Sequence, residues 1–296
     1  MRGLDKIELV GADNMYIDTH TKETIQQSVC QVFNITVKEL EQLFERAGKA
    51  SCTENYMDGD KFNKVINQFI DLKMSNKSID KILFFHLGRR LNSASNCVEG
   101  KNLFELLSTE NEMSTFLKNH EVAFQPNNEH LDLYYKGKLI SLDNNEKEHV
   151  PYLRWRLGYN SNRIDYCFNG FMLRDLLYRN HYARELYDVP EFIGVLATFL
   201  GNRNIGTDYF QNSKYYCFEY LVPIDKVYFD DAEGLPKEGK QRYLLNQVLH
   251  RLYDYAVTDI RYVFDHDNPI LRLADDDVMQ KEYFINKEEI TWEMLR

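Results

Sequence analysis

The feature that most restricts the fold of this chain is a late segment, "SKYYCFEYLVPIDKVYF" (Ser213–Phe229), that is apolar on both faces of an extended strand. From Tyr215 to Val222, alternate residues are apolar on each face, and Glu219 is the single charged residue among them. An ionised carboxylate in such a strand requires a cation, hydrogen-bond donors or a water-filled cleft. Glu219 is therefore a candidate functional residue, with a structural salt bridge as the alternative.

The beginning of the chain has a helical pattern. Across residues 20–78, apolar side chains recur at spacings of three and four, which predicts helices. A short aromatic-rich run, Ile82–Leu87, then predicts a buried strand. We place a domain boundary near residue 78, which gives a helical N-terminal segment (1–78) and a main domain (79–296) with a C-terminal helical extension.

The main domain mixes the two periods. Helices are predicted over 102–120, Leu173–Tyr187, Pro190–Leu200 and 240–257, a hairpin at Lys136-Gly137, and a strand-and-turn region over 151–175. The pattern as a whole predicts an α+β fold.

Composition narrows the classes of partner. The formal charge of −10 and pI near 5.4 oppose a broad nucleic-acid or anionic-membrane surface. Five widely spaced cysteines form no CxxC pair, which favours reduced thiols, and charges interrupt the first 20 residues where a signal peptide would need an apolar core. The longest apolar run, Phe192–Gly201, is about half of a membrane span. We therefore expect a cytoplasmic protein with no membrane contact.

Metal and calcium motifs are missing, and "DDD" at Asp275–Asp277 is interpreted as an exposed acidic loop, so we predict no metal. Two further segments carry candidate residues. His86 ends the apolar run "ILFFHLGRR", and Asn169-Gly170 with Phe171 lies in "DYCFNGFML", where a turn would allow the backbone to approach a ligand. A buried, hydrogen-bonded histidine and a simple turn are the alternatives.

These three elements, in this order, resemble those of the ADP-ribosyltransferases whose signature is His, Tyr and Glu on separate strands. "LFFHLG" resembles the first-strand "YHG" element, "DYCFNGFML" the "DFGxGFY" element, and "YCFEYLVPIDKVYF" the last "EYxV" element. The resemblance covers about 25 residues and implies a split, mixed or antiparallel β-sheet core.

The resemblance also implies a function, which is transfer of ADP-ribose from NAD, as substrate, to a macromolecular acceptor, either protein or nucleic acid. His86 would bind the adenosine ribose, and Glu219 would stabilise the cation formed as nicotinamide departs. Phe171 or Met172 would pack against nicotinamide, with Gly170 beside them, and Arg89 would meet the pyrophosphate. Members of the family include bacterial toxins, effectors and defence factors.

Two alternatives stay open. "RDLLYRNH" resembles the RxxxxxxH motif of HEPN ribonucleases, in which Arg174 and His181 would share one helix face and act on RNA. The other is a non-enzymatic interaction module, with the helical N-terminal segment as a docking surface for a partner. We expect this second alternative to lead if His86, Phe171 and Glu219 lie apart.

Overall fold

The computed structural model describes residues 15–52, 56–74, 78–143, 147–160, 164–263, 265 and 267–296. The chain forms two compact units. Unit 1 contains Met1–Phe84, Phe171–Leu177 and Leu221–Leu271, and unit 2 contains Phe85–Gly170, Tyr178–Tyr220 and Arg272–Arg296. This division differs from the predicted boundary near residue 78, because the chain passes from one unit to the other within strands. The combination of helices and strands confirms the predicted α+β class.

The main sheet of the described residues has the strand order β7-β8-β5-β1-β6-β9. Its strands are β1 (Lys81–Leu91), β5 (Asn169–Phe171), β6 (Ser213–Pro223), β7 (Tyr228–Phe229), β8 (Ile270–Arg272) and β9 (Phe284–Glu289). The two longest, β1 and β6, are the two runs for which the sequence predicts buried strands. Strand β9 pairs antiparallel with β6, placing Asn286 opposite Glu219, and the register shifts between Glu219 and Tyr220.

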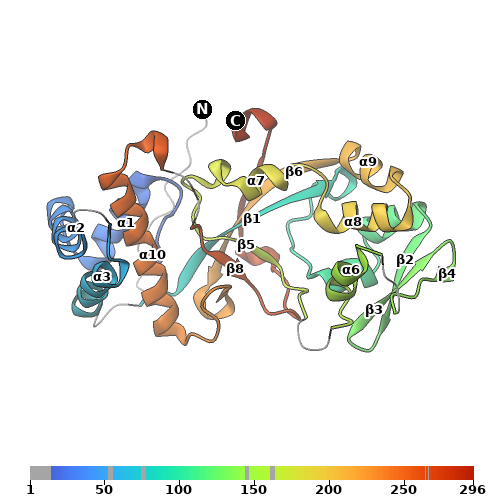
Figure 1. Cartoon of the computed structure of the whole chain (residues 1–296), viewed down its shortest axis with the longest axis horizontal. Helices are drawn as coiled ribbons and strands as arrows, with labels where there is room; N and C mark the ends of the chain where they lie inside the picture. The colour runs from blue at the N-terminus through green and yellow to red at the C-terminus, as the bar shows by residue number, and fades with distance from the viewer. Residues whose placement is uncertain are drawn as a thin grey trace. The chain divides into compact units, whose positions relative to one another are not determined.

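The helices of unit 1 lie together (Figure 1). They are α1 (Lys22–Phe33), α2 (Val37–Ser51), α3 (Gly59–Lys73) and α10 (Lys237–Val257). Capping boxes at Thr21 and Thr36 satisfy the first free N–H groups of α1 and α2, which fixes where these helices begin. Helix α10 packs against α1 and α3, and the rings of Phe62 and Tyr253 lie 4.5 Å apart. The prediction of helices in residues 20–78 is confirmed for the described residues.

Unit 1 also buries a group of charges. Arg251 on α10 forms ion pairs with Asp265 and, at 3.6 Å, with Asp175, and these two aspartate side chains are 0% and 1% exposed. The hydroxyl of Tyr255 donates to Asp175 at 2.7 Å, and the Asn268 amide donates to Asp265 at 2.7 Å. One guanidinium thus ties two carboxylates from separate segments to α10.

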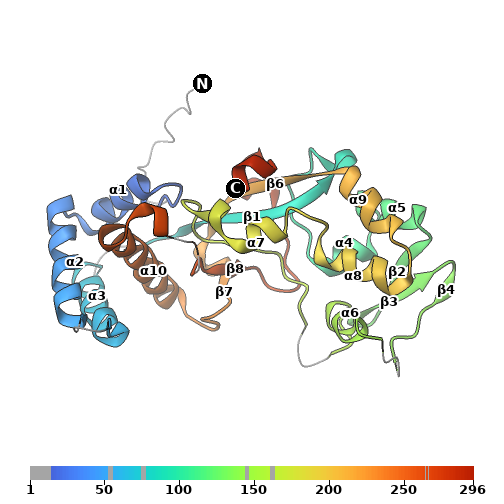
Figure 2. The ribbon, with the colours of Figure 1, turned by 45° about the horizontal axis from the view of Figure 1, so that its top comes forward.

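Unit 2 contains a smaller sheet with helices around it (Figure 2). The sheet has the order β2-β3-β4, with β2 (Val122–Asn127), β3 (His130–Tyr135) and β4 (Lys138–Leu139). The helices around it are α4 (Leu103–Ser108), α5 (Glu112–Asn119), α6 (Val150–Arg156), α8 (Glu191–Leu200) and α9 (Asn204–Gln211). The short α7 (His181–Glu185) belongs to the same unit but lies away from this sheet, near β1 (Figure 2). Lys136 and Gly137 both have positive φ, as a two-residue hairpin turn requires, so the predicted hairpin is confirmed.

Two local predictions were wrong. The region 151–175, predicted as strand and turn, contains most of helix α6 and only the short strand β5. The helix predicted over Leu173–Tyr187 is replaced by a 3-10 turn at Leu177–Arg179 and the short α7. The carbonyl of Leu173, which would accept from the N–H of Leu177 in an α-helix, instead accepts from the Asn268 amide at 2.7 Å, and the Leu177 N–H donates to Arg174 O as in a 3-10 turn.

Among the described helices, none is both long and apolar enough to cross a membrane. The first 14 residues, for which we predict no signal peptide, lie outside the described part of the chain.

Candidate functional site

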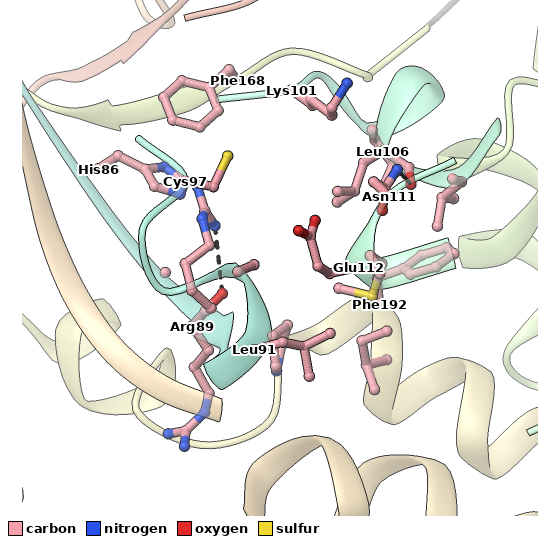
Figure 3. Close-up of a pocket in the computed structure, with 18 of the residues that line it drawn as sticks. His86, Arg89, Leu91, Cys97, Lys101, Leu106, Asn111, Glu112, Phe168 and Phe192 are labelled. Carbon is pink, nitrogen blue, oxygen red and sulfur yellow. Dashed lines mark hydrogen bonds between the residues drawn. The ribbon is translucent and has the colours of Figure 1, made fainter. Parts of the chain in front are cut away.

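Unit 2 contains a pocket of about 300 Å³ beside strand β1, here called the β1 pocket (Figure 3). Its polar wall includes His86, Arg90, Cys97, Lys101 and Glu112, and Phe168 lies beside His86. The remaining wall is mainly apolar and comes from α4 and α8, including Leu106 and Phe192. A pocket of this size that combines an apolar wall with polar groups is typical of small-molecule sites.

The imidazole of His86 is fixed and neutral. Its Nδ1 lies 2.7 Å from the carbonyl oxygen of Asn169, so Nδ1 carries the proton and donates, and Nε2 is an acceptor. Burial lowers the pKa of His86 to about 3, and the positive charge of Arg90 acts in the same direction. Its ring stacks on that of Phe168, with centroids 4.1 Å apart. His86 lies in the pocket wall, and its binding of NAD stays a prediction.

Gly88 keeps the acceptor nitrogen of His86 clear. These two residues share a face of β1, and a Cβ at Gly88 would lie 2.7 Å from Nε2 of His86. Any larger residue at position 88 would therefore press on the nitrogen that is available to a ligand.

Arg89 does not serve the pocket through its guanidinium, which corrects the predicted phosphate contact. The side chain is 7% exposed, and its three nitrogens donate to the Ser213 hydroxyl and to the carbonyls of Ser213, Tyr187 and Phe210 at 2.5–3.1 Å. In Figure 3 this side chain extends away from the pocket centre. Arg89 therefore joins β1 to the start of β6 and to neighbouring segments as a structural residue.

Arg90 is the strand cation of the pocket. It is half-buried, its guanidinium lies 4.8 Å from the centroid of the Phe218 ring, and its charge acts on His86. Because residues four apart on a strand share a face, Arg90 and His86 project to the same side. Arg89 was predicted for this role, whereas alternation along the strand from His86 selects Arg90.

Two carboxylates line the pocket, Glu99 and Glu112, and neither was predicted as a site residue. Glu112 is the first residue of α5, and Asn111 caps this helix by accepting from the N–H of Ser114 at 3.0 Å. Figure 3 shows the Glu112 carboxylate pointing into the pocket. The cap pattern at Asn111 and Ser114 predicts a helix start, but no local signal shows that this start faces β1.

Glu219 is not among the residues that line the β1 pocket. Its neighbour Phe218 faces the His86 side, with ring centroids 6.2 Å apart. Successive side chains of a strand point to opposite faces, so Glu219 projects from the other face of β6. It is half-buried there. The predicted pairing of His86 and Glu219 in one cleft is therefore not observed.

The predicted nicotinamide contacts are also placed differently. Phe171 and Met172 belong to unit 1, where they are 6% and 0% exposed, and Met172 N–H donates to Pro269 O while its carbonyl accepts from the Thr19 hydroxyl. Gly170 is buried in β5. The aromatic residue of this segment that contacts the pocket histidine is Phe168, which stands in the same quoted nonapeptide.

The nuclease pair is not carried by one helix. Arg174 precedes the 3-10 turn and belongs to unit 1, and His181 is the exposed first residue of α7 in unit 2. The predicted common helix face for Arg174 and His181 was therefore wrong.

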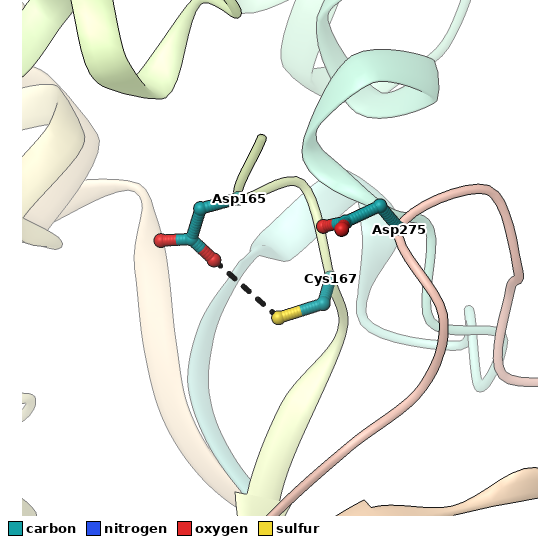
Figure 4. Close-up of side chains that lie close together, drawn as sticks. All are labelled: Asp165, Cys167 and Asp275. Atoms are coloured by element: carbon teal, nitrogen blue, oxygen red, sulfur yellow. Dashed lines mark hydrogen bonds between the residues drawn. The ribbon is translucent and has the colours of Figure 1, made fainter. Parts of the chain in front are cut away.

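One cluster of metal-ligand type occurs among the described residues (Figure 4). Side-chain atoms of Asp165, Cys167 and Asp275 lie within 4.8 Å of one another. Asp165 is ion-paired with Arg156, and Asp275 accepts the N–H of Tyr166 at 2.7 Å. Burial and the neighbouring carboxylates raise the pKa of Cys167 to about 12, so the thiol keeps its proton and donates to Asp165. These bonds give the cluster a structural role, and we assign it no metal.

Comparison of the chain with protein-family models, with curated proteins and with solved structures gave no match.

Proposed function

We propose that unit 2 is a binding module for a nucleotide, with NAD as the ligand that the family resemblance suggests. The observation that carries this proposal is the pairing of the neutral His86 with Arg90 on one face of β1, across from an apolar wall. Nε2 of His86 suits a ribose hydroxyl as an acceptor, and the Arg90 guanidinium suits a phosphate. The side chains of α4 and α8 offer a surface for a flat base.

The separation of Glu219 from His86 favours binding over chemistry that uses Glu219. A carboxylate stabilises a developing cation only at close range in a site that excludes water. Under this proposal Glu219 does not contact the bound nucleotide. We also propose, from the family resemblance, that the main sheet is the split sheet of the ADP-ribosyltransferases.

Isothermal titration of the purified chain with NAD tests the binding proposal. We expect binding that weakens about tenfold or more in Arg90→Met and His86→Ala, because each removes a polar contact worth about 1.4 kcal/mol or more. Glu219→Gln serves as the control and should bind as wild type does. Wild-type affinity in Arg90→Met and His86→Ala, or no binding of NAD, ADP-ribose or AMP, would show that the proposal is wrong.

A second function, ADP-ribosyl transfer to a macromolecule, is favoured by one observation, the Glu112 carboxylate in the β1 pocket. Glu112 is exposed, so to stabilise the cation left on the ribose as nicotinamide departs it must be covered by the bound nucleotide, which would exclude water from it. The family resemblance suggests a role as a toxin, effector or defence factor.

The assay for transfer uses adenine-labelled NAD and a whole-cell lysate, with protease-treated and nuclease-treated lanes to identify the acceptor class. Transfer should be lost in Glu112→Gln and kept in Glu219→Gln. The opposite pattern would restore Glu219 as the catalytic carboxylate. Intact NAD after incubation with wild type would leave binding as the function of the pocket.

A further inference from the structure

A second cavity adjoins the β1 pocket within unit 2. It has a volume of about 470 Å³ and is here called the asparagine groove, lined by Asn92, Ser93, Thr115, Phe116, Asn119 and Asn212. Leu91, Asn111 and Glu112 line both cavities, so Glu112 stands at their shared wall. The three shared residues are labelled in Figure 3.

The lining of the groove is polar but almost uncharged. It contains four asparagines, one serine and one threonine, no lysine or arginine, and Glu112 as its single ionisable group. The side chains of Asn92, Ser93, Thr115 and Asn119 are exposed and make no hydrogen bond to other described residues. Amides and hydroxyls of this kind both donate and accept hydrogen bonds.

An aromatic surface accompanies these polar groups. Phe116 is half-buried, and its ring contacts that of Tyr209 at 5.5 Å, which holds it in place on α5. Sugar hydroxyls also donate and accept, and the C–H face of a sugar ring packs on an aromatic ring. An anionic ligand would meet Glu112 and no cation in this lining.

We propose that the asparagine groove binds a neutral, polyhydroxylated group, a sugar carried by the macromolecular acceptor, next to the nucleotide. The role as acceptor rests on the proposed transfer function, whereas the binding itself does not. In the transfer step, a sugar oxygen bonds to C1 of the nicotinamide ribose as the bond from C1 to the nicotinamide nitrogen breaks. Nicotinamide leaves with the electron pair, and the hydroxyl proton passes to Glu112 and then to solvent.

Saturation-transfer NMR with methyl α-D-glucopyranoside as the probe tests the groove directly. The signal should fall about tenfold in the double variant Thr115→Val, Asn119→Leu and stay unchanged in Lys118→Ala, an exposed control on the same helix that does not line the groove. Thr115 and Asn119 are exposed, so circular dichroism should show wild-type folding for the double variant. An equal signal in the double variant, or no signal in wild type, would overturn the proposal.

A second probe tests whether the groove selects a neutral ligand, and a second assay separates the sugar proposal from the nucleotide proposal. Agmatine, a guanidinium compound, should give no groove-dependent signal, and a signal from agmatine that the double variant removes would overturn the choice of a neutral sugar. In parallel, wild type and Arg90→Met are titrated with NAD. Sugar binding without NAD binding would retain the groove and reject the nucleotide proposal, and NAD binding without sugar binding would do the reverse.

Discussion

Replacing Arg89 by methionine should destabilise unit 2, whereas the same change at the adjacent Arg90 should not. The Arg89 guanidinium donates four hydrogen bonds inside the unit, one to a hydroxyl and three to carbonyls. Hydrogen bonds from a charged donor contribute about 1.5–3 kcal/mol each, a gross sum of roughly 6–12 kcal/mol. Removing the cation also removes its desolvation cost of several kcal/mol, and methionine keeps part of the packing on Phe210. The net loss should be about 3 kcal/mol.

The assay follows unit 2 selectively, because both tryptophans of the chain, Trp155 and Trp292, belong to it. Urea unfolding monitored by tryptophan fluorescence should show a lower midpoint for Arg89→Met. Arg90→Met should lose less than about 1 kcal/mol of unfolding free energy, as expected for a half-buried side chain. Arg89→Lys, which keeps the charge and loses the planar fork, should fall in between. A wild-type midpoint for Arg89→Met, or a larger loss for Arg90→Met, would refute this assignment of the two arginines.

Three further perturbations test the structure. The pKa of His86 is lowered to about 3 from an ordinary 6.5, so below pH 6.5 the unfolded chain binds a proton at this residue that the folded chain does not. The contribution of neutral His86 to stability is therefore complete above pH 6.5 and is lost as the pH falls toward 3. The His86→Gln variant should show a shallower loss of stability in urea titrations across that range, and an unchanged slope would contradict it. Arg251→Met removes the guanidinium that pairs with two buried carboxylates and should cost about 3–5 kcal/mol in urea unfolding followed by far-UV circular dichroism, while a loss under about 1 kcal/mol would argue against a tight ion cluster. Gly100→Ala would place a Cβ 2.3 Å from the Phe168 ring, so we expect a loss of about 1–3 kcal/mol and weaker NAD binding, and wild-type values for both would be inconsistent with the observed packing.

The helices and the hairpin could be predicted because their signals are local. Apolar spacing marks α1 and α3, and the Lys136-Gly137 pair marks the turn between β3 and β4. The helix predicted from Leu173 failed although its apolar pattern is helical. The Leu173 carbonyl, which would accept the first bond of that helix, accepts instead from Asn268, which lies far away in the sequence. A local pattern cannot report such partners.

Site residues that lie on one strand could be predicted from the sequence. Those whose position depends on how two strands are aligned could not. His86, Gly88 and Arg90 share a face of β1 by period 2, so the pocket cation could have been assigned from His86 alone. The face of Glu219 depends on how β6 is aligned with its neighbours. A shift of one residue in that alignment would move every side chain of β6 to the opposite face.

This dependence on alignment explains why a three-segment resemblance can be present without the matching site. The motif "CFEYLV" shows only that a carboxylate lies between aromatic residues. In the folded strand it is Phe218, and not Glu219, that faces His86. Two side chains on opposite faces of one sheet are separated by the backbone layer and cannot both contact one small ligand. If NAD is cleaved in the β1 pocket, the carboxylate that assists must therefore come from outside β6. The carboxylates that line the pocket are Glu99 and Glu112, and Figure 3 shows that of Glu112 pointing into it.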